Sequence, residues 1–128
     1  MDQKTHDKGL EIRKAVLGEA YVNNALKNAD SFNKPFQELV TEYCWGAVWT
    51  RDGLTRQSRS ILNLGMLSAL GRSHELKLHI RGALNNGLTR EEIREVFMQV
   101  AIYCGVPAAV ESFRCAREVF AEIDGNRA

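Results

Sequence analysis

Apolar residues recur at spacings of three and four along most of the chain, the pattern of helices that bury one face. No segment sustains alternation of apolar and polar positions, and none contains a two-residue hairpin turn, so strands are not expected. Glycine and proline residues divide the pattern into short segments. The sequence therefore predicts an all-α, single-domain bundle of about six or seven helices over residues 1–128.

The boundaries of several helices can be predicted from local signals. Thr89 and Glu92 form a capping box, and Leu88 with Ile93 forms a hydrophobic staple at the start of one helix. We expect residues 1–8 and 124–128 to be frayed. Helices are expected at residues 10–17, 20–29, 36–50, 56–70 and 74–86, from the capping box to Cys104, and after Pro107.

Two stripes run along the expected helix at residues 36–50. One, which we expect to face the core, contains Phe36, Leu39, Val40, Tyr43, Ala47 and Val48. The other contains Glu38, Glu42, Trp45 and Trp49, so both tryptophans of the chain share a face with carboxylates. This second stripe could line a pocket, although such stripes are more often core or subunit interface.

The next helix is apolar nearly all round at residues 61–70, so we expect it to be the central and most buried one. The run is too short to span a bilayer. The polar N-terminus lacks the apolar core of a signal peptide. Three isolated cysteines, Cys44, Cys104 and Cys115, lie in apolar patterns. We interpret them as reduced and buried in a cytoplasmic protein.

Composition excludes several classes of function. A chain of 128 residues is long enough to bury about two-thirds of its unfolded surface without disulfides or metals. A net charge of +1 gives no field for nucleic acid or membrane binding. The sequence has no phosphate-binding glycine loop, no CxxC, no HExxH and no Cys/His cluster with zinc spacing. Metal catalysis is therefore not expected.

Charged residues concentrate near the tryptophans and after the apolar helix. They include Arg51, Arg56, Arg59 and Arg81. A lone arginine can be explained as part of a solvent-exposed rim of surface ion pairs. Several arginines beside an aromatic wall would instead suit the binding of a small polyanion. His79 lies mid-helix beside apolar positions, where a histidine is either a satisfied core residue or a functional group. His74, in the first turn of its helix, is expected to be exposed.

The segment from residue 78 to 113 resembles the carboxymuconolactone decarboxylase family. The resemblance rests on the His79–Leu84 stretch (HIRGAL), Gly87, the capping box and the Tyr103–Pro107 break (YCGVP). Residues 36–72 look specifically like 4-carboxymuconolactone decarboxylases of the protocatechuate branch of aromatic catabolism. Alkylhydroperoxidase-like (AhpD-like) relatives carry a C-x-x-C-x-x-x-H pattern on this helix. Here Arg72 and Glu75 occupy the two cysteine positions, so dithiol redox chemistry is not implied.

The resemblance implies an AhpD-like fold, a ring-like homo-oligomer that is usually a hexamer, and loss of CO2 from a small dianionic lactone. It implies no cofactor, because the substrate itself can accept the electrons that CO2 leaves behind. On this hypothesis the catalytic residues are His79, as oxyanion donor or general acid, and Glu42, which orients His79 or relays a proton. Substrate would be bound by Trp45, Trp49, Arg51, Arg56, Arg59 and Arg81.

Two other functions remain open from the sequence. One is a related enzyme of the same superfamily that acts on another lactone, keto-acid or peroxide. The other is a non-catalytic oligomeric binding module, in which the tryptophan face is an interface and His79 is buried structure.

Overall fold

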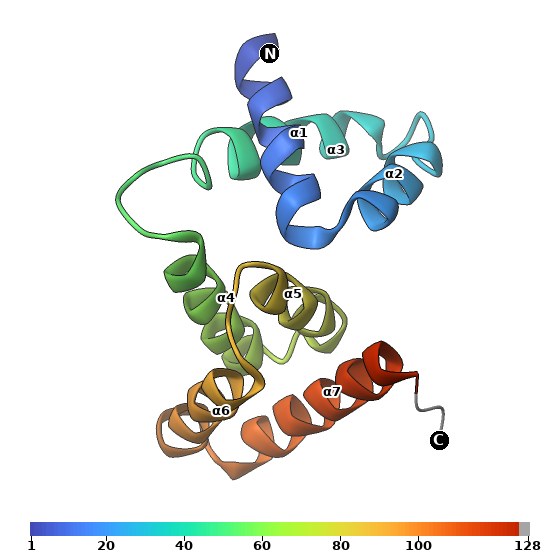
Figure 1. Ribbon diagram of the computed structural model, residues 1–128. Coiled ribbons are helices and arrows are strands. Elements are labelled where there is room, and N and C mark those ends of the chain that lie inside the picture. The colour runs from blue at the N-terminus through green and yellow to red at the C-terminus, as the bar shows by residue number, and fades with distance from the viewer. Residues whose placement is uncertain (126–128) are drawn as a thin grey trace. The chain divides into compact units, whose positions relative to one another are not determined.

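The computed structural model describes residues 1–125, which fall into two compact units that meet in the sequence after Arg56 (Figure 1). Across the described residues there are seven α-helices, one π-helical segment and no strand. The all-α prediction is confirmed. The boundary between the units does not test whether residues 1–128 form one domain, so that stays a prediction.

The first unit contains α1 (Gln3–Leu17), α2 (Glu19–Lys27), α3 (Lys34–Val40) and the π-helical segment η1 (Thr41–Gly46). The expectation that residues 1–8 fray is wrong, because α1 already begins at Gln3. The Asp2 side chain caps α1 by accepting a hydrogen bond from the Lys4 N–H, at 3.1 Å. The Asp2 N–H in turn donates to a Glu42 carboxylate oxygen at 2.6 Å. These bonds tie the first turn of α1 to η1.

α1 packs against η1 at a pair of glycines. A Cβ added to Gly9 would lie 2.1 Å from the Thr41 carbonyl oxygen and 2.6 Å from the Gly46 nitrogen. A Cβ added to Gly46 would lie 2.3 Å from the Thr5 carbonyl oxygen. No side chain fits at either position, so these glycines allow the two backbones to approach each other.

A buried arginine lies at the same contact. The Arg13 guanidinium donates to the Thr41 hydroxyl at 3.1 Å and to the Gln37 side-chain oxygen at 2.9 Å. Both partners are neutral, and burial lowers the pKa of Arg13 from its usual value. Arg13 therefore joins α1 to α3 and η1 by hydrogen bonds to neutral groups.

The expected helix at residues 36–50 is continuous only to Gly46 and changes type at Thr41. Ala47 N–H bonds to the Glu42 carbonyl and Trp49 N–H to the Cys44 carbonyl, five residues back in each case. Hydrogen bonds to the fifth rather than the fourth residue back widen the turn, and this shifts which side chains of η1 share a face. The predicted core stripe is wrong on both sides of that change: Phe36 and Leu39 of α3 and Tyr43 of η1 are each more than half exposed.

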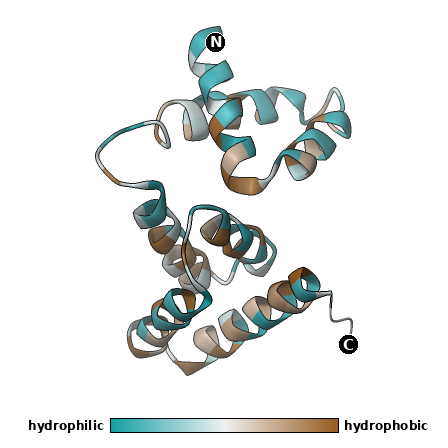
Figure 2. Ribbon diagram, viewed as in Figure 1, coloured by the Kyte–Doolittle hydropathy of each residue, from teal (hydrophilic) through white to brown (hydrophobic). Residues whose placement is uncertain are grey.

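The second unit contains α4 (Arg56–Leu70, whose first residue lies at the boundary), α5 (Ser73–Asn85), α6 (Arg90–Cys104) and α7 (Val106–Asp124). Hydrophobic stretches recur along all four helices (Figure 2). The Thr89–Glu92 capping box is confirmed in full, and the staple residues Leu88 and Ile93 are both buried. Phe97 is wholly buried and meets Phe113 edge-on, with 5.7 Å between ring centroids.

The unit has one contiguous apolar core to which all four helices contribute. Its buried members are Leu64, Leu76, Ile80, Ala83, Leu88, Ile93, Phe97, Val100, Ala109, Cys115, Ala116 and Val119.

The prediction that the helix through residues 61–70 is the most buried is wrong for this chain by itself. Only Ser60, Leu64 and Ser68 are buried on α4, whereas Leu62 and Leu70 are more than half exposed. The buried Ser68 accepts a hydrogen bond from Ser112 of α7 at 2.8 Å. An apolar stretch of sequence is thus left uncovered on one side.

The cysteine prediction is confirmed in part. All three cysteines are free, and Cys115 is buried, but Cys44 is half-buried and Cys104 is exposed. At the C-terminal end α7 runs to Asp124 and Gly125 caps it with a φ of 76°. The predicted frayed segment 124–128 therefore begins in a helix, and its residues 126–128 lie outside the described part of the chain. No helix among the described residues is long and apolar enough to cross a bilayer.

Candidate functional site

The tryptophan pair is buried in the first unit. Trp45 lies in η1 and Trp49 follows it in the turn after Gly46, and they are 4 % and 6 % exposed. Their rings stack with centroids 4.9 Å apart and planes inclined by 23°. The structure thus brings Trp45 and Trp49 together as one apolar, aromatic block.

Glu42 lies half-buried in the first turn of η1. Its carboxylate accepts the Asp2 N–H, so it is held by the start of α1. This hydrogen bond fixes the position of the Glu42 side chain relative to α1.

The four predicted substrate-binding arginines lie in different places. Arg51 is exposed in the loop after η1, and Arg56 is exposed at the start of α4. Arg59 is half-buried one turn further along α4. Arg81 lies on α5 and forms an ion pair with Glu122 of α7.

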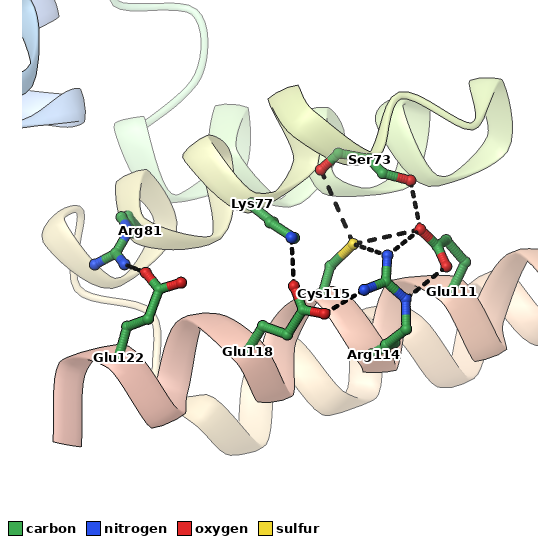
Figure 3. A network of polar contacts seen from close by, with 8 residues as sticks. All are labelled: Ser73, Lys77, Arg81, Glu111, Arg114, Cys115, Glu118 and Glu122. Atoms are coloured by element: carbon green, nitrogen blue, oxygen red, sulfur yellow. Dashed lines mark hydrogen bonds and ion pairs between the residues drawn. The ribbon is translucent and has the colours of Figure 1, made fainter. Parts of the chain in front are cut away.

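The Arg81 pair belongs to a row of polar contacts between α5 and α7 (Figure 3). Ser73 donates to Glu111 at 2.6 Å and Lys77 pairs with Glu118. Since Ser73, Lys77 and Arg81 are four residues apart, they lie on one face of α5. This row gives Arg81 a structural partner in the second unit, and its substrate-binding role stays a prediction.

His79 is half-buried on α5, beside buried apolar residues of the same helix (Leu76, Ile80 and Ala83). Burial lowers the pKa of His79, and the carboxylate of Glu75, one turn earlier, opposes that shift in part. The imidazole is therefore neutral at pH 7. A neutral imidazole has one N–H to donate and one nitrogen that accepts.

Asn63 of α4 approaches the His79 ring from the neighbouring helix. Its side-chain nitrogen lies 3.5 Å from Nδ1 of His79. Sequence reasoning did not single out Asn63. The available signal was a lone carboxamide within the apolar run ILNLGML, where a polar group needs a partner.

The eight predicted site residues divide between the two units. Glu42, Trp45, Trp49, Arg51 and Arg56 belong to the first unit, and Arg59, His79 and Arg81 belong to the second. Glu42 is held by Asp2 of the first unit, and Arg81 pairs with Glu122 of the second. The hypothesis that Glu42 orients His79 stays a prediction.

An open apolar groove of about 770 Å³ runs between α4 and α6 of the second unit. Its floor contains Ile61, Leu62, Gly65 and Met66 of α4 with Val96 and Val100 of α6. Neither His79 nor any predicted arginine lines it. In the described part of the chain, no group of three or more histidine, cysteine or acidic side chains is placed to hold a metal ion.

Residues 34–118 match the model of the carboxymuconolactone decarboxylase family, and this stretch includes all eight predicted site residues. The chain is 41% identical over 122 residues to 4-carboxymuconolactone decarboxylase of Acinetobacter baylyi, covering 95% of this chain and 91% of that protein. The chain belongs to the carboxymuconolactone decarboxylase family.

Two relatives of this chain are decarboxylases named for different substrates. The chain is 49% identical over 112 residues to the nitrosuccinic acid decarboxylase of Metarhizium robertsii, covering 88% of this chain and 78% of that protein. It is 33% identical over 87 residues to an uncharacterised 15.0 kDa protein of Paracoccus denitrificans, covering 66% of this chain and 65% of that one. Identity with two different decarboxylases makes the reaction type better supported than the substrate.

Proposed function

We propose that this chain is a carboxy-lyase that converts 4-carboxymuconolactone to β-ketoadipate enol-lactone and CO2, in the protocatechuate branch of aromatic catabolism. The observation that carries the proposal is 41% identity along nearly the whole chain to a 4-carboxymuconolactone decarboxylase. The predicted His79–Leu84 motif and the tryptophan stretch both fall within the matched region.

The chemistry of this substrate requires no external electron acceptor. The carbon that loses CO2 is joined through a C=C bond to the lactone carbonyl. The two electrons of the breaking C–C bond move through that double bond to the carbonyl oxygen, giving a furan-type oxyanion. One proton then adds to the ring carbon next to the carbonyl. A dianionic substrate and one proton thus become CO2 and a monoanionic product.

His79 is suited to stabilise the oxyanion. Because burial keeps its ring neutral at pH 7, it can donate an N–H hydrogen bond while adding no charge of its own. A preorganised donor of this kind can contribute about 3–4 kcal/mol to transition-state stabilisation. On this proposal His79 acts as the oxyanion donor.

The remaining roles concern the substrate's charges and its surroundings. The stacked tryptophans would form an apolar wall that excludes water from the departing carboxylate. Arg51, Arg56, Arg59 and Arg81 would hold the two carboxylates. Glu42 would orient His79 or relay the proton.

The test is turnover of 4-carboxymuconolactone, followed by loss of its ultraviolet absorbance. We expect His79→Ala to lower kcat by about 100- to 1000-fold and Glu42→Gln to lower it as well. The matched control is His74→Ala, because His74 lies on the same helix and is exposed. If a folded His79→Ala or Glu42→Gln variant keeps near wild-type turnover, that residue has no part in the mechanism.

Nitrosuccinic acid is a second candidate substrate, favoured by the 49% identity to the Metarhizium enzyme. Its nitro group is attached to the carbon that bears one of its two carboxylates. Loss of that carboxylate leaves a nitronate, so the nitro group takes the place of the lactone carbonyl as electron acceptor. Both substrates are small dianions that develop negative charge on oxygen.

The two substrates are distinguished by comparing kcat/KM for CO2 release from each. A ratio well above one for the lactone supports the first assignment. The reverse ratio assigns the chain to nitrosuccinic acid and retains the decarboxylase chemistry. Release of CO2 from neither compound would favour a related enzyme acting on another lactone, keto-acid or peroxide, or a non-catalytic binding module.

We also propose that the chain assembles as a homo-oligomer, a hexamer by family resemblance, and works in the cytoplasm. Apolar side chains that are more than half exposed, including Phe36, Leu39, Leu62 and Leu70, support assembly, as does the groove between α4 and α6. Light scattering after size-exclusion chromatography measures the assembly. We expect Leu62→Glu to dissociate it and Asn23→Glu, at an exposed position of α2, to leave it intact.

A further inference from the structure

Asn63 lies on α4 within the run of residues 61–70 and is half-buried next to the wholly buried Leu64. A carboxamide at such a position loses part of its contact with water, and this is unfavourable unless its polar atoms find partners. The partner that the structure gives its side-chain nitrogen is Nδ1 of His79, at 3.5 Å. The contact joins α4 to α5 at the proposed oxyanion donor.

The chemistry of the two groups fixes the direction of this bond. A carboxamide nitrogen carries two N–H groups and accepts no hydrogen bond. With the carboxamide nitrogen facing the ring, Nδ1 of His79 is the acceptor and carries no proton. Since a neutral imidazole has a single ring proton, that proton is on Nε2.

The position of the proton decides what His79 can do for the reaction. With the proton on Nε2, that nitrogen can donate a hydrogen bond to a developing oxyanion. With the proton on Nδ1, Nε2 would present a lone pair that repels the same oxygen. A separation of 3.5 Å is long for a hydrogen bond, so the contact contributes little to stability. Its consequence is the choice between two tautomers of similar energy.

We propose that Asn63 is a positioning residue of the decarboxylase site, which donates to Nδ1 of His79 and thereby keeps the ring proton on Nε2. The proposal rests on the proposed function of His79. It applies equally to a lactone oxyanion and to a nitronate, because both place new negative charge on oxygen. Burial of the imidazole supports it, since a protonated ring would have no tautomer to select.

The first measurement uses the intact protein labelled with ¹⁵N-histidine. Long-range ¹H–¹⁵N correlation spectra at pH 8 report which nitrogen of each neutral histidine carries the proton. The chain has three histidines, and His79→Gln identifies the signals of residue 79. We expect the Nε2–H tautomer in the wild type. The Nδ1–H tautomer in the wild type would overturn the proposal.

The decisive variant is Asn63→Asp, which has nearly the same shape but places acceptor oxygens beside Nδ1. We expect the His79 proton to move to Nδ1. We also expect kcat to fall by about 100-fold or more, with KM changed by less than about threefold. Asn86→Asp is the matched control, because Asn86 joins the same two helices through the Ser60 hydroxyl at 2.8 Å. It should change neither the tautomer nor kcat.

The two readouts separate failure of this proposal from failure of the proposed function. An unchanged tautomer in folded Asn63→Asp overturns the positioning role, as does a changed tautomer with wild-type kcat. If the wild-type chain releases CO2 from neither substrate, the decarboxylase function fails. The spectra then still decide whether Asn63 sets the His79 tautomer.

Discussion

The helices within each unit are joined by contacts of a different kind. In the first, α1 meets η1 through a backbone approach at Gly9 and Gly46, with a buried arginine bonded to neutral groups. In the second, four helices bury one contiguous apolar cluster, and a row of ion pairs lies along α5 and α7. Both units bury apolar side chains, among them Val16, Val22 and the two tryptophans in the first. The first unit depends in addition on the close fit of two backbones, whereas the second depends mainly on buried apolar area.

This difference matters because the predicted site residues are held in different ways in the two units. The stacked tryptophans and Glu42 are positioned by the contact between α1 and η1. His79 is positioned by the apolar neighbours of α5 and by Asn63. The units can be followed separately, because both tryptophans of the chain lie in the first one and their fluorescence reports its unfolding.

The largest effect is expected for Phe97→Ala in the second unit. Phe97 is wholly buried and contacts Phe113, so truncation should reduce the free energy of unfolding by about 3–5 kcal/mol. Urea denaturation followed by far-ultraviolet circular dichroism measures the change. The control is Met98→Ala, at the next, more than half-exposed residue, which should change the unfolding free energy by less than about 0.5 kcal/mol. Equal effects of the two substitutions would contradict a core centred on Phe97.

The next effect tests the close approach in the first unit. Gly9→Ala places a methyl group within 3 Å of three backbone atoms, so we expect α1 to move away from η1 at a cost of about 3 kcal/mol. The tryptophan fluorescence transition in urea should move to lower denaturant concentration. Unchanged fluorescence unfolding would show that the two backbones are not in contact.

Gly65→Ala in the second unit is the matched control for that substitution. The new methyl group meets no atom within 4 Å, and alanine favours the helix by up to about 1 kcal/mol. We therefore expect a small stabilisation. Since Gly65 lines the groove between α4 and α6, destabilisation accompanied by loss of assembly would instead identify the groove as a subunit contact.

A smaller effect is expected from the titration of His79. Its pKa is lowered on folding, so below the unfolded value of about 6.5 the unfolded chain binds more protons. Stability due to the neutral ring is present above that pH and declines as pH falls toward the lower folded pKa. We expect His79→Gln to reduce the loss of unfolding free energy between pH 7 and pH 5. An identical pH dependence in wild type and variant would show that burial does not shift the His79 pKa.

The smallest effect is expected at the polar row of the second unit. Arg114 and the Ser73 hydroxyl hold the pKa of Glu111 at about 2, below its usual value of 4.5. The stabilisation is present above pH 4.5 and is lost as pH falls toward about 2. Glu111→Gln should flatten the acid side of the stability profile slightly, because exposed ion pairs contribute little. A large loss of stability at pH 7 would mean that the row supports the fold more strongly than its exposure indicates.

Local signals in the sequence predicted local structure well. The Thr89–Glu92 capping box requires only neighbouring residues, and the structure has it. Glycine was expected to divide the helical segments, and the structure has glycines of positive φ between helices at Gly18, Gly71 and Gly105. The predictions that α4 and the stripe beginning at Phe36 are buried were wrong. A hydrophobic pattern shows which side chains avoid water but not which surface covers them. The change to a π-helix at Thr41 also escaped prediction, because the spacing of apolar residues along the chain does not show it.

The sequence by itself determined the all-α class, the family and the set of chemical groups available for a decarboxylation, because these depend on residue types and their spacing. Only the tertiary structure decided which groups meet. In the structure Trp45 stacks on Trp49, and Asn63 lies beside His79. Glu42 accepts a hydrogen bond at the start of α1, and Arg81 forms an ion pair with Glu122. The His79 contact joins residues sixteen apart on two helices, and such a meeting is set by helix packing rather than by any periodic pattern along one helix.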